Sequence, residues 1–412
     1  MRKNLFALYG VQVATLVLPL LSIPFLARVL GPSALGELAA IQSLFATLGF
    51  LIEYGFNFSA TRQAAIHQHD RSKLTEILGN VLGAKLLLSL LFLLVSVTIY
   101  FLVPVFRTHP LVFWLGFAGA LAQGFNLMWF YQGIEKMSLA ASVDIVCKSA
   151  YIALLFFFVR SAEDLTLVVG LQSVSFLLSL IINAYCIRRY SDLPSLSLAG
   201  SLAALKEGRS MFLFRGMTLF YTTANSALLR LYVPAANVAY YSNAERLTNV
   251  SFSAFTPLVQ VLFPRLNYLV HHDFEEAKKF FRKSFYIIMP LSILSAIAAY
   301  FLAPWAVNLI FGEKYLQTVD IFRILLINIP LISAGTLFGL QWLVPNGMQY
   351  KFNIAIGISA AINVSSVIFI VPIYKATGMA WTVVFCELII ASLTILNVLR
   401  HPTNPFSAIK SR

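Results

Sequence analysis

The segment "ARVLGPSALGELAAIQSL" (residues 27–44) has a counterpart in the second half of the chain, "LRLYVPAANVAYYSNAERL" (residues 229–247). With one residue inserted in the turn, similar residues align in pairs: Arg28 with Arg230, Pro32 with Pro234, Gln42 with Glu245, and further along Arg62 with Arg265. Internal repeats of this kind are typical of membrane transporters. The similarity therefore predicts two halves with the same helical plan.

The chain as a whole is too apolar to be a soluble protein. Hydrophobic residues make up 59% of its 412 residues, charged residues make up 11%, and the mean hydropathy is +0.80. Soluble domains have about 25% charged residues. The alternating pattern of outer-membrane β-strands is absent, and apolar residues run continuously instead. We therefore predict an all-α polytopic membrane protein.

Apolar stretches long enough to cross about 30 Å of hydrocarbon as helices can be placed along the chain. Twelve of them lie near residues 5–30, 34–57, 77–105, 111–134, 139–159, 165–187, 210–233, 236–263, 284–311, 321–345, 350–373 and 377–399. The repeat divides these twelve transmembrane helices into two six-helix bundles. We expect an N-terminal bundle over 1–190, a cytoplasmic linker over 191–208 and a C-terminal bundle over 209–412.

The distribution of basic residues predicts the orientation. The chain has 30 lysines and arginines and a net charge of +13. When the N-terminus is placed in the cytoplasm, most of them fall in inner loops and at inner helix ends, as the positive-inside rule requires. We therefore predict cytoplasmic termini, and we attribute the basic character to topology rather than to a nucleic-acid partner.

Polar residues form a stripe on each of two predicted helices, 34–57 and 236–263. Residues three and four apart share a helix face, and these stripes include Gln42, Glu53, Asn57, Glu245 and Asn249. An unsatisfied polar group facing lipid costs several kcal/mol. The stripes are therefore expected to face protein or a water-filled cavity.

Charged residues also occur inside the predicted spans, where they are rare and usually line a pathway. Basic residues predominate among them, so a hydrated cavity would attract an anion. The candidate anion-binding residues are Arg28, Arg62, Lys85, Lys148, Arg215, Arg230 and Arg265. Two simpler interpretations stay open: the helix-end arginines extend to the lipid headgroups, and Asp144 with Lys148 forms a structural pair.

Three carboxylates are candidates for proton or ion coupling: Glu53, Asp144 and Glu387. A carboxylate in a low-dielectric setting can take up a proton and carry it across the membrane. Glu53 is preferred because it lies on a polar stripe, and the alternative is a structural partnership with an arginine. The histidine pairs His67 with His69 and His271 with His272 lie in predicted loops without a supporting cysteine cluster, so no metal and no cofactor is expected.

Four stretches carry a resemblance to a known family: "RVLGPSALGELAAIQS" (28–43), "EYGFNFSATRQAA" (53–65), "WFYQGIEKM" (129–137) and "FNIAIGISAAINVSSVIFIVPIYKATGMAWTVVFCELI" (352–389). With them the chain resembles O-antigen flippases of the Wzx type. These flippases form part of the polysaccharide transport branch of the multidrug/oligosaccharidyl-lipid/polysaccharide exporter superfamily.

The resemblance implies a V-shaped pair of six-helix bundles around a central cavity in the bacterial inner membrane, and a protein that is not an enzyme. The implied substrate is an undecaprenyl-diphosphate-linked oligosaccharide, moved from the cytoplasmic to the periplasmic leaflet. Membrane lipids, an O-antigen polymerase and a chain-length regulator are the further partners it implies. The alternatives are a multidrug or other small-molecule antiporter of the same fold, a membrane-bound sugar polymerase or ligase, and a structural scaffold.

Overall fold

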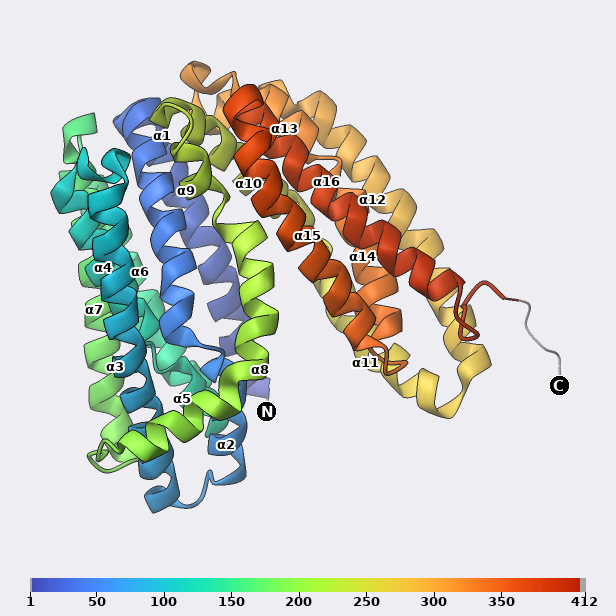
Figure 1. Cartoon of the computed structure of the whole chain (residues 1–412), viewed down its shortest axis with the longest axis horizontal. Coiled ribbons are helices and arrows are strands. Elements are labelled where there is room, and N and C mark those ends of the chain that lie inside the picture. Colours follow the sequence, from blue (N-terminus) through green and yellow to red (C-terminus); the bar gives the residue numbers. More distant parts are fainter. Residues whose placement is uncertain (1, 408–412) are drawn as a thin grey trace. The chain divides into compact units, whose positions relative to one another are not determined.

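Every regular element in the part of the chain that the structure, a computed structural model, describes is a helix (Figure 1). The backbone is described for residues 2–407. Side chains are described for the same range except for residues 2–20, 210, 211, 213–215, 217, 218, 220, 221, 256, 257 and 260. Within these bounds there is no β-strand, which confirms the all-α class.

The helices fall into two compact units, Met1–Leu219 and Phe220–Arg412. The first unit contains α1 (Arg2–Glu53), α2 (Phe56–Ile66), α3 (Arg71–Leu102), α4 (Pro110–Gly124), α5 (Met128–Gly133), α6 (Met137–Phe158), α7 (Leu165–Cys186) and most of α8 (Leu198–Thr223), with short 3₁₀ turns η1 (Pro104–Arg107), η2 (Ala162–Asp164) and η3 (Ile187–Arg189). The second contains α9 (Asn225–Arg230), α10 (Ala235–Ser253), α11 (Thr256–His272), α12 (Phe274–Phe311), η4 (Glu313–Tyr315), α13 (Thr318–Leu325), α14 (Asn328–Gly335), the π-helical η5 (Thr336–Leu343), α15 (Gln349–Phe369) and α16 (Val371–Leu399).

Nine helical segments of the described residues are long and apolar enough to cross a membrane. The first two predicted helices are joined in α1, which changes direction at Gly31, a residue with φ of 71° that precedes a proline. The predicted helices at 210–233 and 236–263 are helical but are not among the nine. The predicted helix at 210–233 includes side chains outside the described set, and the predicted helix at 236–263 carries a polar stripe. The total of twelve stays a prediction.

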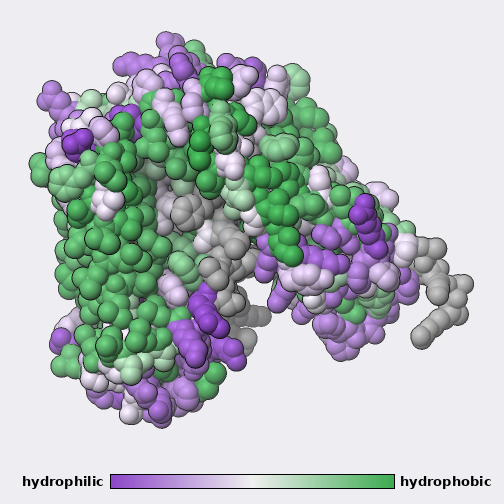
Figure 2. Space-filling model, viewed as in Figure 1, coloured by the Kyte–Doolittle hydropathy of each residue, from purple (hydrophilic) through white to green (hydrophobic). Residues whose placement is uncertain are grey.

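The surface of the first unit has the distribution expected for a lipid-embedded bundle (Figure 2). Hydrophobic residues cover its side, and hydrophilic residues gather at its two ends. On α3, for example, Leu86, Leu90 and Leu94 are all exposed. Apolar surface this extensive is rare on soluble monomers. The chain is therefore a multi-pass membrane protein.

Two spans of the first unit are interrupted by short non-helical segments. Helix α1 ends at Glu53, and α2 begins at Phe56 after Tyr54 and Gly55, whose φ angles are both positive (48° and 80°). Glycine adopts this left-handed conformation at little cost. The second interruption, residues 125–127, separates α4 from α5.

Helices α2 and α5, which follow the two interruptions, pack against each other in a dense apolar core. Trp129, Phe130 and Tyr131 of α5 are fully buried together with residues of α2 and α3. The hydroxyl of Thr61 on α2 donates to the Trp129 carbonyl at 3.1 Å. Two of the motifs behind the family resemblance, 53–65 and 129–137, are therefore packing partners.

The segment predicted as a linker, 191–208, packs on α3, and α8 already begins within it at Leu198. Arg71 at the start of α3 forms an ion pair with Asp192 at 2.8 Å. Ser191 is buried and lies 3.0 Å from the Thr75 hydroxyl. These contacts fix the beginning of α8 to the first unit. The domain boundaries given above remain predictions.

Candidate functional site

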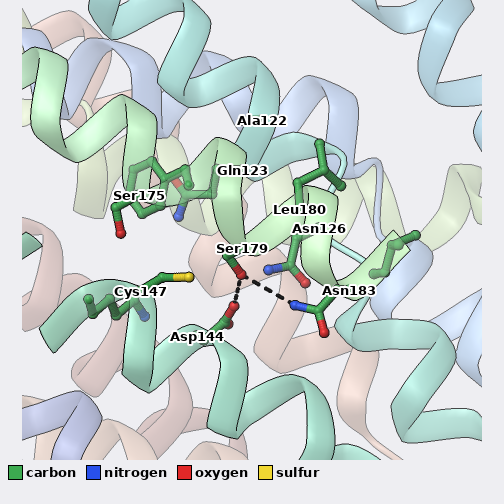
Figure 3. Close-up of a pocket in the computed structure, with 12 residues that line it drawn as sticks. Ala122, Gln123, Asn126, Asp144, Cys147, Ser175, Ser179, Leu180 and Asn183 are labelled. Atoms are coloured by element: carbon green, nitrogen blue, oxygen red, sulfur yellow. Dashed lines mark hydrogen bonds between the residues drawn. The ribbon is translucent and has the colours of Figure 1, made fainter. Parts of the chain in front are cut away.

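A polar pocket lies inside the first unit, between α4, α6 and α7 (Figure 3). Its empty volume is about 440 Å³, including the part open to solvent. It is lined by Ala122, Gln123, Asn126, Leu127, Asp144, Cys147, Lys148, Ser175, Phe176, Ser179, Leu180 and Asn183. Because the three helices are transmembrane segments, this pocket places amide, hydroxyl and charged groups at membrane depth.

One hydrogen bond in the pocket joins α6 to α7, and a second lies within α7. Ser179 donates through its hydroxyl to the carboxylate of Asp144, and the Asn183 amide donates to the Ser179 hydroxyl at 3.3 Å (Figure 3). Asn183 is 3% exposed, and its amide oxygen has no partner among the described residues. This oxygen is therefore available to a water molecule or to a donor group of a ligand.

Lys148 lies one helical turn after Asp144 and lines the same pocket. In the described part of the chain no ion pair joins the two side chains. The structural pair that was left open as a simpler interpretation is thus not formed, and Asp144 accepts a hydrogen bond from Ser179 of α7. Lys148 is left as a cation on the pocket wall, where it can act on a bound anion.

Lys85 occupies a different place, at the break between α4 and α5. Its side chain is 1% exposed. Its ammonium donates to the carbonyl oxygens of Gly124 at 2.8 Å and Asn126 at 3.2 Å. The carboxylate of Glu53 acts on the same ammonium electrostatically, and Asn57 donates its amide to Glu53. The structure therefore brings Lys85, Glu53 and Asn57 together.

The second unit has its own buried polar cluster. Glu245 on α10 accepts hydrogen bonds from the hydroxyl of Tyr241 at 3.2 Å and from the amide of Asn225 at 3.4 Å. Glu387 on α16 is 8% exposed, and Asn363 on α15 is fully buried with both amide atoms unpartnered among the described residues. Carboxylates buried in this way can exchange a proton or bind a cation.

The remaining predicted residues are distributed over both units. Arg28, Arg62 and Arg265 are exposed, as is Asn249. Arg230 is half-buried and donates to the Val233 carbonyl at 3.2 Å. The amide of Gln42 donates to Gln172 of α7 at 2.9 Å. The Arg215 side chain lies outside the described residues.

Sequence reasoning missed the residues that α7 contributes to the pocket. Ser175, Ser179 and Asn183 follow one another at intervals of four, so they share one face of that helix. This spacing was a readable signal. In the described part of the chain, no group of three or more histidine, cysteine, aspartate or glutamate residues is placed to hold a metal ion.

Long apolar helices with polar and charged groups buried between them define a multi-pass membrane protein of the transporter class. Residues 1–270 match the family model described as "Polysaccharide biosynthesis protein", and the chain belongs to that family.

Two relatives match over nearly the full length. A "Putative O-antigen transporter" of Shigella dysenteriae is 25% identical, covering 95% of this chain and 98% of its own. The protein of the same name from Escherichia coli (strain K12) is 24% identical, covering 97% and 96%. The resemblance to O-antigen transporters is thereby confirmed, and the relatives are transporters rather than enzymes.

Solved structures with the same fold include the lipid II flippase MurJ in an inward closed conformation. It has a TM-score of 0.73 and 15% sequence identity, covering 97% of this chain and 89% of that one. An inward-facing multidrug resistance transporter of the MATE family and the MOP superfamily has a TM-score of 0.70 and 16% identity, covering 93% of both chains. At these identities the likeness shows the fold.

Proposed function

We propose that the protein is a flippase for lipid-linked polysaccharide precursors. Its substrate is an undecaprenyl-diphosphate-linked O-antigen or polysaccharide repeat unit, moved from the cytoplasmic to the periplasmic leaflet of the bacterial inner membrane by alternating access. The observation that carries the proposal is the full-length similarity to O-antigen transporters. The fold, shared with a lipid II flippase, supports it.

The chemistry of such a substrate agrees with the polar groups of the first unit. A diphosphate headgroup carries negative charge, and a cation at membrane depth can hold it through charged hydrogen bonds. Lys148 lies on the wall of a polar pocket between transmembrane helices. The proposal gives Lys148 a contact to diphosphate or to a neighbouring sugar, with Arg28, Arg62, Arg215, Arg230 and Arg265 as further anion-binding residues.

The proposal includes a proton-coupled return of the empty transporter. The surroundings of the two main carboxylates favour Glu387 over Glu53 as the carrier. Glu53 interacts electrostatically with the ammonium of Lys85. Glu387 is buried on α16, and no hydrogen bond or ion pair to it was found among the described residues. A carboxylate without a cationic partner is better suited to cycle between its two protonation states.

A deletion in the bacterium that encodes the protein tests the substrate and the direction together. In a background without the polymerase, single repeat units are expected at the cell surface when the transporter is present. Without it, lipid-linked repeat units should accumulate and be inaccessible to lectins added outside spheroplasts. A plasmid-borne copy should restore surface display. Unchanged display after deletion would reject the proposal.

A second candidate function is export of small molecules, since the fold is shared with a multidrug resistance transporter. Measuring the drug susceptibility of the same deletion strain distinguishes the two functions. A flippase predicts unchanged susceptibility to cationic drugs and loss of surface repeat units. An antiporter predicts increased susceptibility with normal display.

A further inference from the structure

The two interrupted spans of the first unit meet at one buried ammonium group. Helix α3 passes both interruptions without a break, and its Lys85 reaches the gap between α4 and α5. The gap between α1 and α2 is adjacent, because a side chain at Gly124 would meet Ile52 of α1 at 2.8 Å. Both discontinuities therefore lie around Lys85.

The oxygen atoms around Lys85 form the type of ligand set that binds a small cation. The last carbonyls of a helix have no partner within the helix, and the C-terminal end of its dipole favours positive charge. The carbonyls of Gly124 and Asn126 come from the end of α4 and the gap after it, and the carboxylate of Glu53 acts on the same ammonium electrostatically. In transporters with broken helices, unwound carbonyls of this kind coordinate monovalent cations.

We propose that the paired helix break is a monovalent-cation site whose occupant is the protein's own ammonium group, Lys85. The tethered cation satisfies the carbonyls after α4 and balances Glu53 at the end of α1. It holds the two broken spans together without a free ion. The proposal does not depend on the identity of the transported substrate.

The proposal also explains why Lys85 differs from Lys148. Lys148 lines an open pocket and has no ion-pair partner among the described residues, whereas Lys85 is buried and makes two hydrogen bonds to backbone carbonyls. The side chain of Asn126 accepts a hydrogen bond from the backbone N–H of Met128, the first residue of α5, at 2.7 Å. Lys85 is thus a positioning residue.

Chemical rescue tests this assignment. Lys85→Ala removes the ammonium and leaves space, so the purified variant should melt at a lower temperature than the wild type in detergent. Methylammonium or ammonium should recover at least half of that loss. Concentrations of about 10–100 mM are appropriate, because a tethered group acts at an effective concentration in the millimolar range or above. Sodium or potassium ions that recover stability would also support a cation site.

Two controls distinguish rescue at a specific cation site from a general effect of salt. Tetramethylammonium has the same charge but no N–H donor, and it should not stabilise Lys85→Ala. Lys85→Met fills the space with apolar atoms, so methylammonium should leave its melting temperature unchanged. A folded Lys85→Ala variant that no cation stabilises would overturn the proposal. Equal stabilisation by tetramethylammonium would do the same, since it would indicate a general salt effect.

A double-mutant cycle covers the case in which Lys85→Ala does not fold. Glu53→Gln should lower the melting temperature more in the wild-type background than in the Lys85→Met background, because its interaction with the Lys85 ammonium exists only in the first. Additive effects of the two substitutions would reject the assignment. The readout is melting temperature, so failure of the flippase proposal would leave the result interpretable.

Discussion

At the scale of single residues, the positive charge of Lys148 is the feature of the pocket most relevant to an anionic substrate. Charged hydrogen bonds are worth about 1.5–3 kcal/mol, so Lys148→Ala should weaken substrate binding roughly tenfold or more. We expect reduced flipping at low substrate concentration in proteoliposomes, with partial recovery in Lys148→Arg. Lys73→Ala is the matched control, because Lys73 is exposed and forms a surface ion pair with Glu76 at 2.8 Å. Equal activity of Lys148→Ala and Lys73→Ala would contradict a substrate contact.

At the scale of helical elements, the close approach of α2 and α5 determines the inner core of the first unit. A side chain at Gly133 would lie 2.4 Å from the Ala64 methyl group. Gly133→Ala should therefore force the two helices apart and cost about 1–3 kcal/mol, as overpacking does. A lower melting temperature in detergent is the expected result.

Gly49 on α1 provides a control of the same kind. A side chain there would meet Ala120 at 3.7 Å, an ordinary contact. Gly49→Ala should leave stability unchanged or raise it by up to about 1 kcal/mol, since alanine favours the helix. If both alanine variants melt at the wild-type temperature, the packing of α2 against α5 is less tight than described.

At the scale of the whole molecule, orientation in the membrane follows from the basic loops. Reporter fusions after Arg71 and Lys279 should give a cytoplasmic signal, and a fusion after Lys375 should give a periplasmic one. The expectation rests on the positive-inside rule and on the predicted number of crossings. A reversed signal at any one of the three positions would show that the predicted topology is wrong there.

The energy source that drives transport is also a property of the whole molecule. Moving one charge through the membrane potential is worth about 2.3 kcal/mol per 100 mV. A substrate with two negative charges would therefore gain roughly 5 kcal/mol per 100 mV on leaving a negative cytoplasm. Proteoliposomes with independently imposed pH and electrical gradients can separate this contribution from proton coupling.

We expect Glu387→Gln to remove the response to the pH gradient and to keep the response to the electrical potential. Glu53→Gln, in protein that remains folded, should keep both. The opposite result would return the role of proton carrier to Glu53. A wild-type protein that responds only to the electrical potential would leave no role for a proton carrier.

The sequence by itself determined the class, the approximate helix positions and the family. A segment that crosses lipid must satisfy its backbone internally and present apolar side chains, and both requirements can be read along the chain. For the same reason, α3 to α7 lie close to their predicted ranges. The charges at membrane depth were also visible in sequence, since they interrupt otherwise apolar runs.

Only the tertiary structure decided which partners these charges have. Asp144 and Lys148 share a helix face at a spacing that suggests a pair, yet Asp144 is bound by Ser179 from α7. Lys85 was a candidate anion-binding residue, and the structure shows its ammonium donating to backbone carbonyls of a broken span. Such contacts depend on where helices break and how each is rotated against its neighbours. Packing between distant segments sets both, so local sequence does not reveal them.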